Sequence, residues 1–129
     1  GAGLPGIPLS ILCQDKQFYL LDSSQKKQQF VALAIKSLRL MNATGVLSSA
    51  QTYQPEQKFS TILTRAFAPL TQMITMTKHL LDEDGRFLAM MGKSPENLTL
   101  PTGFSLEKVV VLKVPQENAA RHLAIIRSK

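Results

Sequence analysis

The sequence predicts an α/β fold in which a mostly parallel sheet is covered by helices and closed by an antiparallel hairpin. Short apolar segments alternate with amphipathic helical segments along most of the chain, a pattern typical of parallel strands joined by helical crossovers. A glycine-rich turn opens the chain. Two apolar strands separated by a short polar loop close it, and we expect them to pair as antiparallel neighbours.

The opening part of the chain predicts a helix, a strand and a second helix. The first helix is short and is expected over residues 7–13, and a buried strand follows over 17–21. The second helix is expected over 25–41, with Ser23 or Ser24 as its cap. The stripe that we expect to face the core contains Phe30, Ala34, Leu38 and Met41, with Val31 and Ile35 beside it.

Two more strands and a helix are expected in the middle of the chain. The strands cover residues 45–49 and 59–66. The helix has Pro69 in its first turn, where a missing N–H costs little, and the polar segment 82–85 is expected to end it. Its expected inner face contains Leu70, Met73, Ile74, Thr77, Leu80 and Leu81.

Three further strands complete the prediction, over residues 85–92, 108–115 and 121–127. The last two form the closing hairpin. A dinucleotide dehydrogenase would continue with a second half of alternating strands and helices, and the sequence leaves no room for one. One domain is the natural interpretation of 129 residues.

Composition narrows the class of protein. Hydrophobic residues make up 44% of the chain, enough for a core, and the formal net charge is +6. A basic chain favours an anionic partner such as RNA, although a basic surface kept for solubility is an equal alternative. The longest apolar run, over residues 30–35, is far below the roughly 20 residues that span a bilayer.

The sequence favours a cytoplasmic protein without a metal. Cys13 is the only cysteine, so no intrachain disulfide can form, which suits a reducing compartment. No signal peptide is recognisable. Cys13, His79 and His122 lack the spacing of metal ligands, so we expect no metal site.

The opening turn, "GAGLPGIP", has the spacing of a nucleotide-binding loop. Gly1, Gly3 and Gly6 fit the pattern G-x-G-x-x-G. Pro5 and Pro8 each remove a backbone N–H that a pyrophosphate would use. The loop therefore favours a ligand without phosphates, such as S-adenosylmethionine, over a dinucleotide. An ordinary strand-to-helix turn is the alternative.

Asp22 follows the loop at the end of the next strand, 16 positions after Gly6. A carboxylate at the carboxyl end of a strand can accept hydrogen bonds from ribose hydroxyls. It can equally begin the cap of the helix that follows, and the sequence leaves both roles open.

Five segments together carry a resemblance to a known family. "GAGLPGIPLSI", "LLDSSQKKQQF", "TRAFAPL", "GRFLAMMG" and "RHLAIIR" resemble, in order and spacing, the small-subunit (16S) ribosomal RNA methyltransferase G family, also called the glucose-inhibited division protein B family. The resemblance covers almost the whole chain. It implies a class I methyltransferase with a Rossmann-like sheet that transfers a methyl group from S-adenosylmethionine to N7 of a guanine in 16S ribosomal RNA.

The resemblance also implies roles for particular residues. Asp22, with Ser23, would hold the ribose, and Ala50 and Gln51 would flank the adenine. Arg65, in "TRAF", would sit beside the methionine end and position the transfer without acting as a general base. The cofactor loop would be formed by Gly1, Gly3, Leu4 and Gly6. RNA contacts are expected from Lys26, Lys27, Lys93 and Arg121, although any single lysine is as easily a solvated surface residue.

The chain departs from the family pattern at three places. The strand that ends in Asp-Val-Gly before the first glycine, and the helical segment before it, are absent, so we expect a domain truncated at its N-terminus with two open inner edges. We expect these 129 residues alone to be marginally stable or to associate, to bind the cofactor poorly and to lack activity. Gln51 replaces the usual glutamate, and Met91 replaces a basic residue. Lys93, two positions further on, could take the place of that basic residue. The last two departures keep a second function open, a non-catalytic module of the same fold that binds RNA or a partner. A nicotinamide-dependent oxidoreductase is a weaker third.

Overall fold

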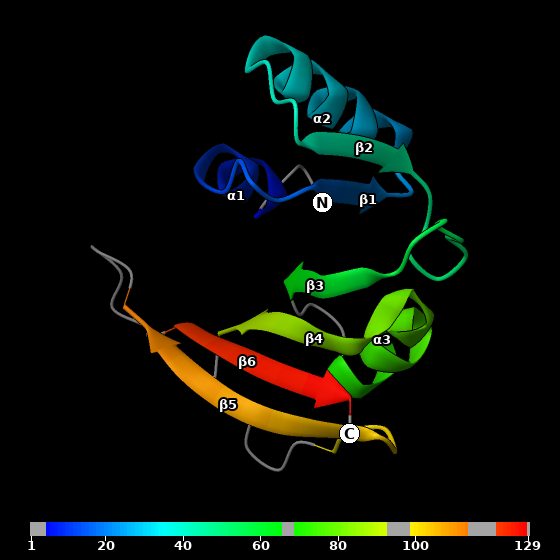
Figure 1. Ribbon diagram of the computed structural model, residues 1–129, viewed down its shortest axis with the longest axis vertical. Helices are drawn as coiled ribbons and strands as arrows, with labels where there is room; N and C mark the ends of the chain where they lie inside the picture. Colours follow the sequence, from blue (N-terminus) through cyan, green and yellow to red (C-terminus); the bar gives the residue numbers. More distant parts are fainter. Residues whose placement is uncertain (1–4, 66–68, 93–98, 114–120, 129) are drawn as a thin grey trace. The chain divides into compact units, whose positions relative to one another are not determined.

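The computed structural model of the chain divides into two compact units, Gly1–Tyr53 and Gln54–Lys129, which are described separately (Figure 1). The described residues are 5–65, 69–92, 99–113 and 121–128. Four residues to which the resemblance gives a role lie outside them, namely Gly1, Gly3, Leu4 and Lys93.

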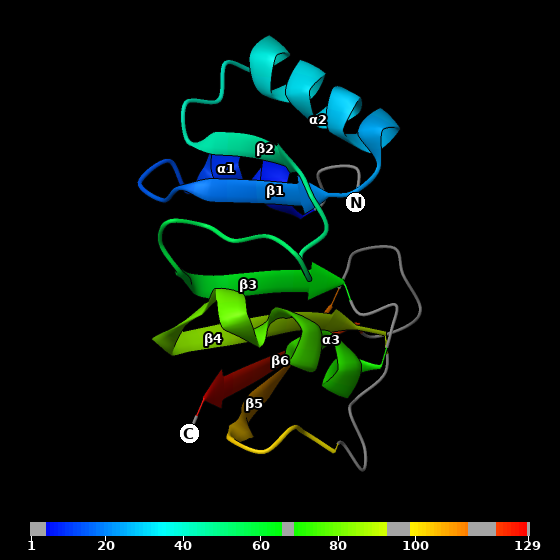
Figure 2. The ribbon, with the colours of Figure 1, turned by 90° about the vertical axis from the view of Figure 1, so that its right-hand side faces the viewer.

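The first unit is a two-stranded parallel sheet with two helices (Figures 1 and 2). Strands β1 and β2 pair without a bulge, from Phe18 opposite Ala43 to Asp22 opposite Leu47. Parallel strands need a crossover, and helix α2 supplies it. In chain order the elements are α1 (Gly6–Leu12), β1 (Phe18–Asp22), α2 (Gln25–Ser37) and β2 (Ala43–Leu47).

Both helices pack on one face of this small sheet. A Cβ built on Gly6 of α1 would lie 1.8 Å from Leu20 Cδ2, and one built on Gly45 of β2 would lie 2.7 Å from Gln28 Oε1 of α2. Leu20 and Gly45 are partners across the two strands, so their side-chain directions share a face. The buried apolar residues of the unit are Ile7, Val31 and Ala43.

The stripe predicted to face the core on α2 is wrong in part. Gln28 and Val31 are the buried residues of the helix. Gln28 Nε2 donates to the Leu20 carbonyl oxygen at 2.9 Å, so a polar residue occupies the inner face where apolar periodicity cannot reveal it. Three members of the predicted stripe are instead exposed, by 56%, 52% and 94% for Phe30, Leu38 and Met41.

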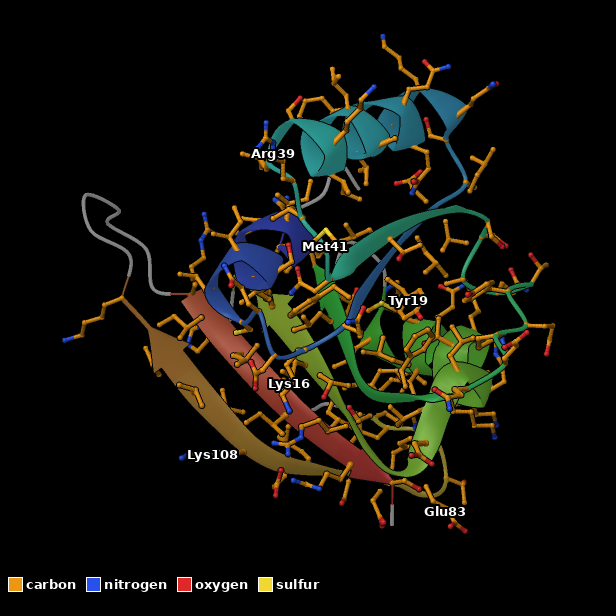
Figure 3. All side chains as sticks on the ribbon, turned by 45° about the horizontal axis from the view of Figure 1, so that its top comes forward. Lys16, Tyr19, Arg39, Met41, Glu83 and Lys108 are labelled. Atoms are coloured by element: carbon orange, nitrogen blue, oxygen red, sulfur yellow. The ribbon has the colours of Figure 1, made fainter. Side chains whose placement is uncertain are left out.

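Helix α2 also ends earlier than predicted, at Ser37 rather than at residue 41. Leu38 is its C-cap, and Arg39 follows with φ 53°. A residue in the left-handed region cannot continue a right-handed helix. Arg39 and Met41 therefore belong to the turn between α2 and β2, where both are labelled in Figure 3.

The second unit is a four-stranded mixed sheet in the order β3-β4-β6-β5. β3 and β4 are parallel, whereas β6 is antiparallel to both β4 and β5. The predicted closing hairpin is thus confirmed. The elements are β3 (Phe59–Arg65), α3 (Leu70–Thr77), a 3-10 turn (Lys78–Leu80), β4 (Leu81–Met91), β5 (Phe104–Leu112) and β6 (Arg121–Ser128).

Helix α3 packs on one face of this sheet and forms the core with it (Figure 2). Its predicted inner face is confirmed for Leu70, Ile74 and Thr77, which are buried, and for Met73, which packs against the core. The other two predicted members, Leu80 and Leu81, are buried but lie beyond the helix, in the 3-10 turn and at the start of β4. Alternate residues of β4 and β6 meet the helix, namely Phe87, Ala89, Ala124 and Ile126. Phe87 also stands edge-on to Phe104 of β5, with ring centroids 5.8 Å apart.

The polar segment 82–85 does not end the helix but lies inside β4, so that prediction is wrong. Phe59 of β3 pairs with Leu81, and Thr61 pairs with Arg86, so two residue steps on β3 match five on β4. The register shift leaves room for a bulge, in which the three acidic side chains are exposed. A solvated bulge and a turn have the same polar composition, so the sequence pattern could not separate them.

The strand directions match the predicted fold class. The strands lie in two sheets, and among the described strands β1 pairs only with β2 and β3 only with β4. Each unit therefore has an edge strand with a partner strand on one side. The expectations of a single domain and of open inner edges stay predictions.

Candidate functional site

The carboxyl ends of β1 and β2 meet at Asp22. The backbone N–H of Ser48, just beyond β2, donates to the Asp22 carbonyl oxygen at 3.1 Å. A turn follows that contains the half-buried Ala50 and the exposed Gln51. The structure therefore brings to one end of the first sheet the residues that the resemblance assigns to the ribose and the adenine.

The Asp22 carboxylate also organises the start of α2. Its Oδ1 accepts a hydrogen bond from the Ser24 backbone N–H at 2.7 Å. Ser24 in turn is the N-cap, and its Oγ accepts from the Lys27 backbone N–H at 3.3 Å. Ser23, the other cap candidate, is exposed between them. A carboxylate has two oxygens with several lone pairs, so it can accept more than one hydrogen bond.

The electrostatic surroundings keep Asp22 ionised. Hydrogen bonds to the charged form are the main cause that lowers the pKa of the carboxyl from its ordinary value of 3.8, and the bond from Ser24 is one of them. The positive charge of Lys27 acts in the same direction, while partial burial opposes it. A carboxylate held in its charged form is a good acceptor for a neutral hydroxyl donor.

Gly6 is the motif glycine that falls within the described residues. It is buried, and it begins α1 directly against Leu20 of β1. In nucleotide-binding loops the third glycine allows close packing of helix on strand, and Gly6 has that role here. Pro5 stands at the N-cap of α1, which makes no side-chain cap hydrogen bond.

The remaining described candidates belong to other elements. Arg65 is the exposed last residue of β3 and pairs in register with Met90 of β4. Met91 packs partly buried against the core of the second unit, a position that suits an apolar side chain. Arg121 begins β6, and Lys26 and Lys27 lie exposed in the first turn of α2.

Asn42 is a structural residue that the sequence patterns did not reveal. Its side chain is buried, and Nδ2 lies 3.0 Å from the Ser10 carbonyl oxygen, 3.1 Å from that of Cys13 and 2.9 Å from that of Lys16. One amide thus ties the end of α1 and the turn after it to the start of β2. A lone asparagine next to a strand carries no periodic signal, so only the tertiary contacts disclose it.

The parts of the chain that the structure describes contain no group of three or more His, Cys, Asp or Glu side chains that could hold a metal ion. No helix in these parts is long and apolar enough to cross a membrane.

Solved structures establish the fold. The chain is similar to an rRNA methylase from Streptococcus thermophilus, with a TM-score of 0.67, 15% identity and coverage of 99% of this chain and 81% of that one. It is also similar to a mutant of MtNAS in complex with S-adenosylmethionine, with a TM-score of 0.73, 15% identity and coverage of 97% and 50%. The fold is that of the class I methyltransferases.

Sequence comparison places the chain more narrowly. It belongs to the rRNA small subunit methyltransferase G family, whose profile matches residues 1–124. Ribosomal RNA small subunit methyltransferase G of Haemophilus influenzae is 46% identical over 98% of this chain, and that of Photobacterium profundum is 40% identical over 100%. The chain spans 64% of the length of each of these relatives. The family resemblance seen in the sequence is confirmed.

Proposed function

We propose that this protein transfers a methyl group from S-adenosylmethionine to N7 of a guanine in 16S ribosomal RNA. The observation that carries the proposal is the position of Asp22 at the carboxyl end of β1, beside the end of β2, in a chain of this family. Ligands of open α/β sheets bind at the carboxyl ends of their strands.

The local chemistry fits S-adenosylmethionine better than a dinucleotide. Asp22 accepts hydrogen bonds from the ribose hydroxyls, while Ala50 and Gln51 flank the adenine. Pro5 and Pro8 withhold two N–H groups that a pyrophosphate would need. S-adenosylmethionine has no phosphate and loses nothing by their absence. Gly1, Gly3, Leu4 and Gly6 complete the cofactor loop in this proposal, with Ser23 next to Asp22.

The proposed reaction needs alignment rather than acid-base groups. When bound, S-adenosylmethionine supplies a methyl group on a positively charged sulfur. The N7 lone pair of guanine forms the new bond as the carbon–sulfur bond breaks, so no general base is required. We assign to Arg65 the positioning of the methionine end and the transfer site.

The RNA substrate explains the basic character of the chain, with its formal net charge of +6. Lys26, Lys27, Lys93 and Arg121 are the proposed phosphate contacts. A target base inside a folded RNA must be unpaired or extruded from its stack to enter a methyltransferase pocket. The proposal includes a cytoplasmic location and the 16S ribosomal RNA or the small subunit as the partner.

Methyl transfer tests the proposal directly. The full-length protein, with the expected N-terminal strand, is incubated with S-adenosylmethionine labelled in its methyl group and with 16S ribosomal RNA or small subunits that lack the modification. We expect label in the RNA and strand cleavage at one guanine by chemistry specific for N7-methylguanine. Label at another atom, or none on either substrate, would contradict the proposal.

A non-catalytic RNA-binding or partner-binding module is the second candidate. Gln51, exposed in the turn after β2, favours it, because this residue replaces a glutamate on the adenine side. Calorimetry with S-adenosylmethionine distinguishes the two. No heat and no thermal shift on the full chain, together with intact RNA binding, would support the module.

A further inference from the structure

Helix α2 has a ridge of exposed side chains that winds around the helix from its first turn to its last. Lys27, Phe30, Leu33 and Lys36 follow one another at intervals of three residues and so are neighbours on the helix surface. All four are exposed, including the apolar Phe30 at 56% and Leu33 at 63%. We call these four residues the outer ridge. Because Gln28 and Val31 dock α2 on the sheet, the outer ridge does not contribute to the core of the first unit.

Two of the three lysines of α2, Lys26 and Lys27, lie where the helix dipole does not favour a cation. Lys26 and Lys27 are in the first turn, which has no acidic residue. The partial positive charge of a helix N-terminus disfavours cations there and favours Asp or Glu. The negative charge of Asp22 partly offsets this cost for Lys27. Lys36 lies in the last turn, where the helix dipole favours a cation. Helix α2 contains no acidic residue that would neutralise its lysines. Its positive surface therefore favours an anionic ligand, although the two lysines in the first turn do not stabilise the helix.

The exposed ring of Phe30 lies one helical turn from Lys26 and Lys27, and this neighbourhood restricts the kind of ligand further. The ligand must offer a flat apolar surface together with negative charge. An unpaired nucleotide offers both, since its base stacks on an aromatic side chain and its phosphate pairs with a lysine. A second copy of the chain would bring one basic ridge against another, which like-charge repulsion opposes.

We propose that the outer ridge of α2, together with the neighbouring Lys26, binds unpaired RNA, with Phe30 stacking on a base and Lys26 and Lys27 contacting phosphates. The ridge is a binding surface outside the cofactor site and takes part in no bond-forming step. It rests on the proposed function only in that the RNA would be a segment of the same substrate. Leu33 extends the apolar surface beside the ring, and Lys36 ends it with a further cation.

Fluorescence anisotropy with a fluorescein-labelled, single-stranded RNA of about 12 nucleotides tests this surface over a series of salt concentrations. Phe30→Leu removes the ring but keeps an apolar side chain with a good helix propensity. We expect affinity to fall at least about fivefold with an unchanged salt slope, because stacking carries no charge. Phe30→Trp should bind as well as the wild type or better.

Lys26→Gln should behave differently, lowering the affinity and reducing the salt slope by about one. Two exposed residues of the second unit supply matched controls. Val111→Thr removes apolar exposure of a similar extent, and Lys58→Gln removes one exposed positive charge. Both controls should bind RNA as the wild type does, and circular dichroism checks that every variant is folded.

Two results would overturn the inference. One is wild-type RNA affinity in Phe30→Leu, and the other is self-association of the wild type, seen by sedimentation without RNA, that Phe30→Leu abolishes. Failure of the proposed function looks different. If Phe30 controls RNA affinity but no methyl transfer occurs, the enzymatic proposal fails and the ridge stands. If transfer occurs and Phe30→Leu binds RNA normally, only the ridge fails.

Discussion

Gly6 and Leu20 are packed so closely that a methyl group on Gly6 would require the Leu20 side chain to move. A Cβ built on Gly6 would lie 1.8 Å from Leu20 Cδ2 and 3.3 Å from Leu20 Cγ. The last glycine of the opening motif therefore has a packing role that can be separated from any contact with a ligand.

Gly6→Ala should destabilise the first unit. Leu20 has to move to admit the new methyl group, and overpacking of this kind costs about 1–3 kcal/mol in the free energy of unfolding. Urea unfolding followed by tyrosine fluorescence measures the effect, because the chain has no tryptophan and its two tyrosines, Tyr19 and Tyr53, lie in the first unit. Gly92→Ala is the control, since its Cβ would meet nothing closer than Arg121 Nη1 at 3.5 Å. Equal stability of the two variants would refute the packing role.

Asn42→Asp should be strongly destabilising. The substitution keeps the shape of the side chain but removes the N–H donors that serve the carbonyl oxygens of Ser10, Cys13 and Lys16. Leaving buried acceptors unsatisfied costs about 1–3 kcal/mol, and more where a charge is buried as well. The same urea experiment applies, and hydrogen exchange should show that the end of α1 opens first. Gln29→Ala, an exposed amide on α2, should change stability by no more than about 0.5 kcal/mol.

Two substitutions of Asp22 should separate its structural role from its proposed role in binding. Asp22→Asn keeps an oxygen that can accept from the Ser24 N–H, whereas Asp22→Ala keeps none. We expect both to weaken binding of S-adenosylmethionine about tenfold or more, because each removes the charged acceptor for the ribose. Asp22→Ala should lower the melting temperature further than Asp22→Asn, because the asparagine loses only the contribution of the charge and keeps an acceptor for Ser24. Calorimetric affinities of Asp22→Asn equal to those of the wild type would remove Asp22 from the cofactor site.

The stability that Asp22 contributes should depend on pH in a definite direction. The pKa of its carboxyl is lowered below 3.8 in the folded chain, so the unfolded chain binds the proton more readily. The contribution is therefore present above about pH 3.8 and is lost as the pH falls through the lower, folded pKa. Urea midpoints of the wild type and of Asp22→Asn should converge at acid pH. A gap between them that widens on acidification would show that the sign is wrong.

Arg65→Ala should abolish methyl transfer while the fold remains intact. Arg65 is exposed at the end of β3, so truncation of its side chain leaves no cavity in the core of the second unit. Single-turnover transfer to 16S ribosomal RNA measures the loss, and circular dichroism checks the fold. Arg86→Ala, which removes an exposed arginine from β4, is the matched control and should retain transfer. Wild-type rates in Arg65→Ala would exclude the positioning role.

The sequence predicted the structure best where the apolar residues that repeat along the sequence are also the residues that the core buries. The inner face of α3 was predictable because its apolar residues repeat with the helical period and the core takes the same residues. The closing hairpin was predictable because a short polar loop between two apolar strands brings them side by side, where they pair in antiparallel fashion. Asp22 was found as a candidate because it directly follows a short apolar strand.

Other features depended on contacts between distant residues. The inner face of α2 includes Gln28 because the Leu20 carbonyl oxygen is there to accept its amide N–H. The acidic segment of β4 is a bulge because Phe59 and Thr61 pair with residues five apart. Neither feature can be predicted from local propensity or periodicity.

The sequence by itself determined the fold class and the family, and it predicted the ends of strands at which a ligand would bind. These follow from patterns that short segments carry alone. The tertiary structure decided that Asp22 holds the turn into α2, that Gly6 is needed against Leu20 and that Phe30 faces solvent rather than the core. Each of these depends on which polar or apolar atom lies opposite, and that is set only when distant segments pack together.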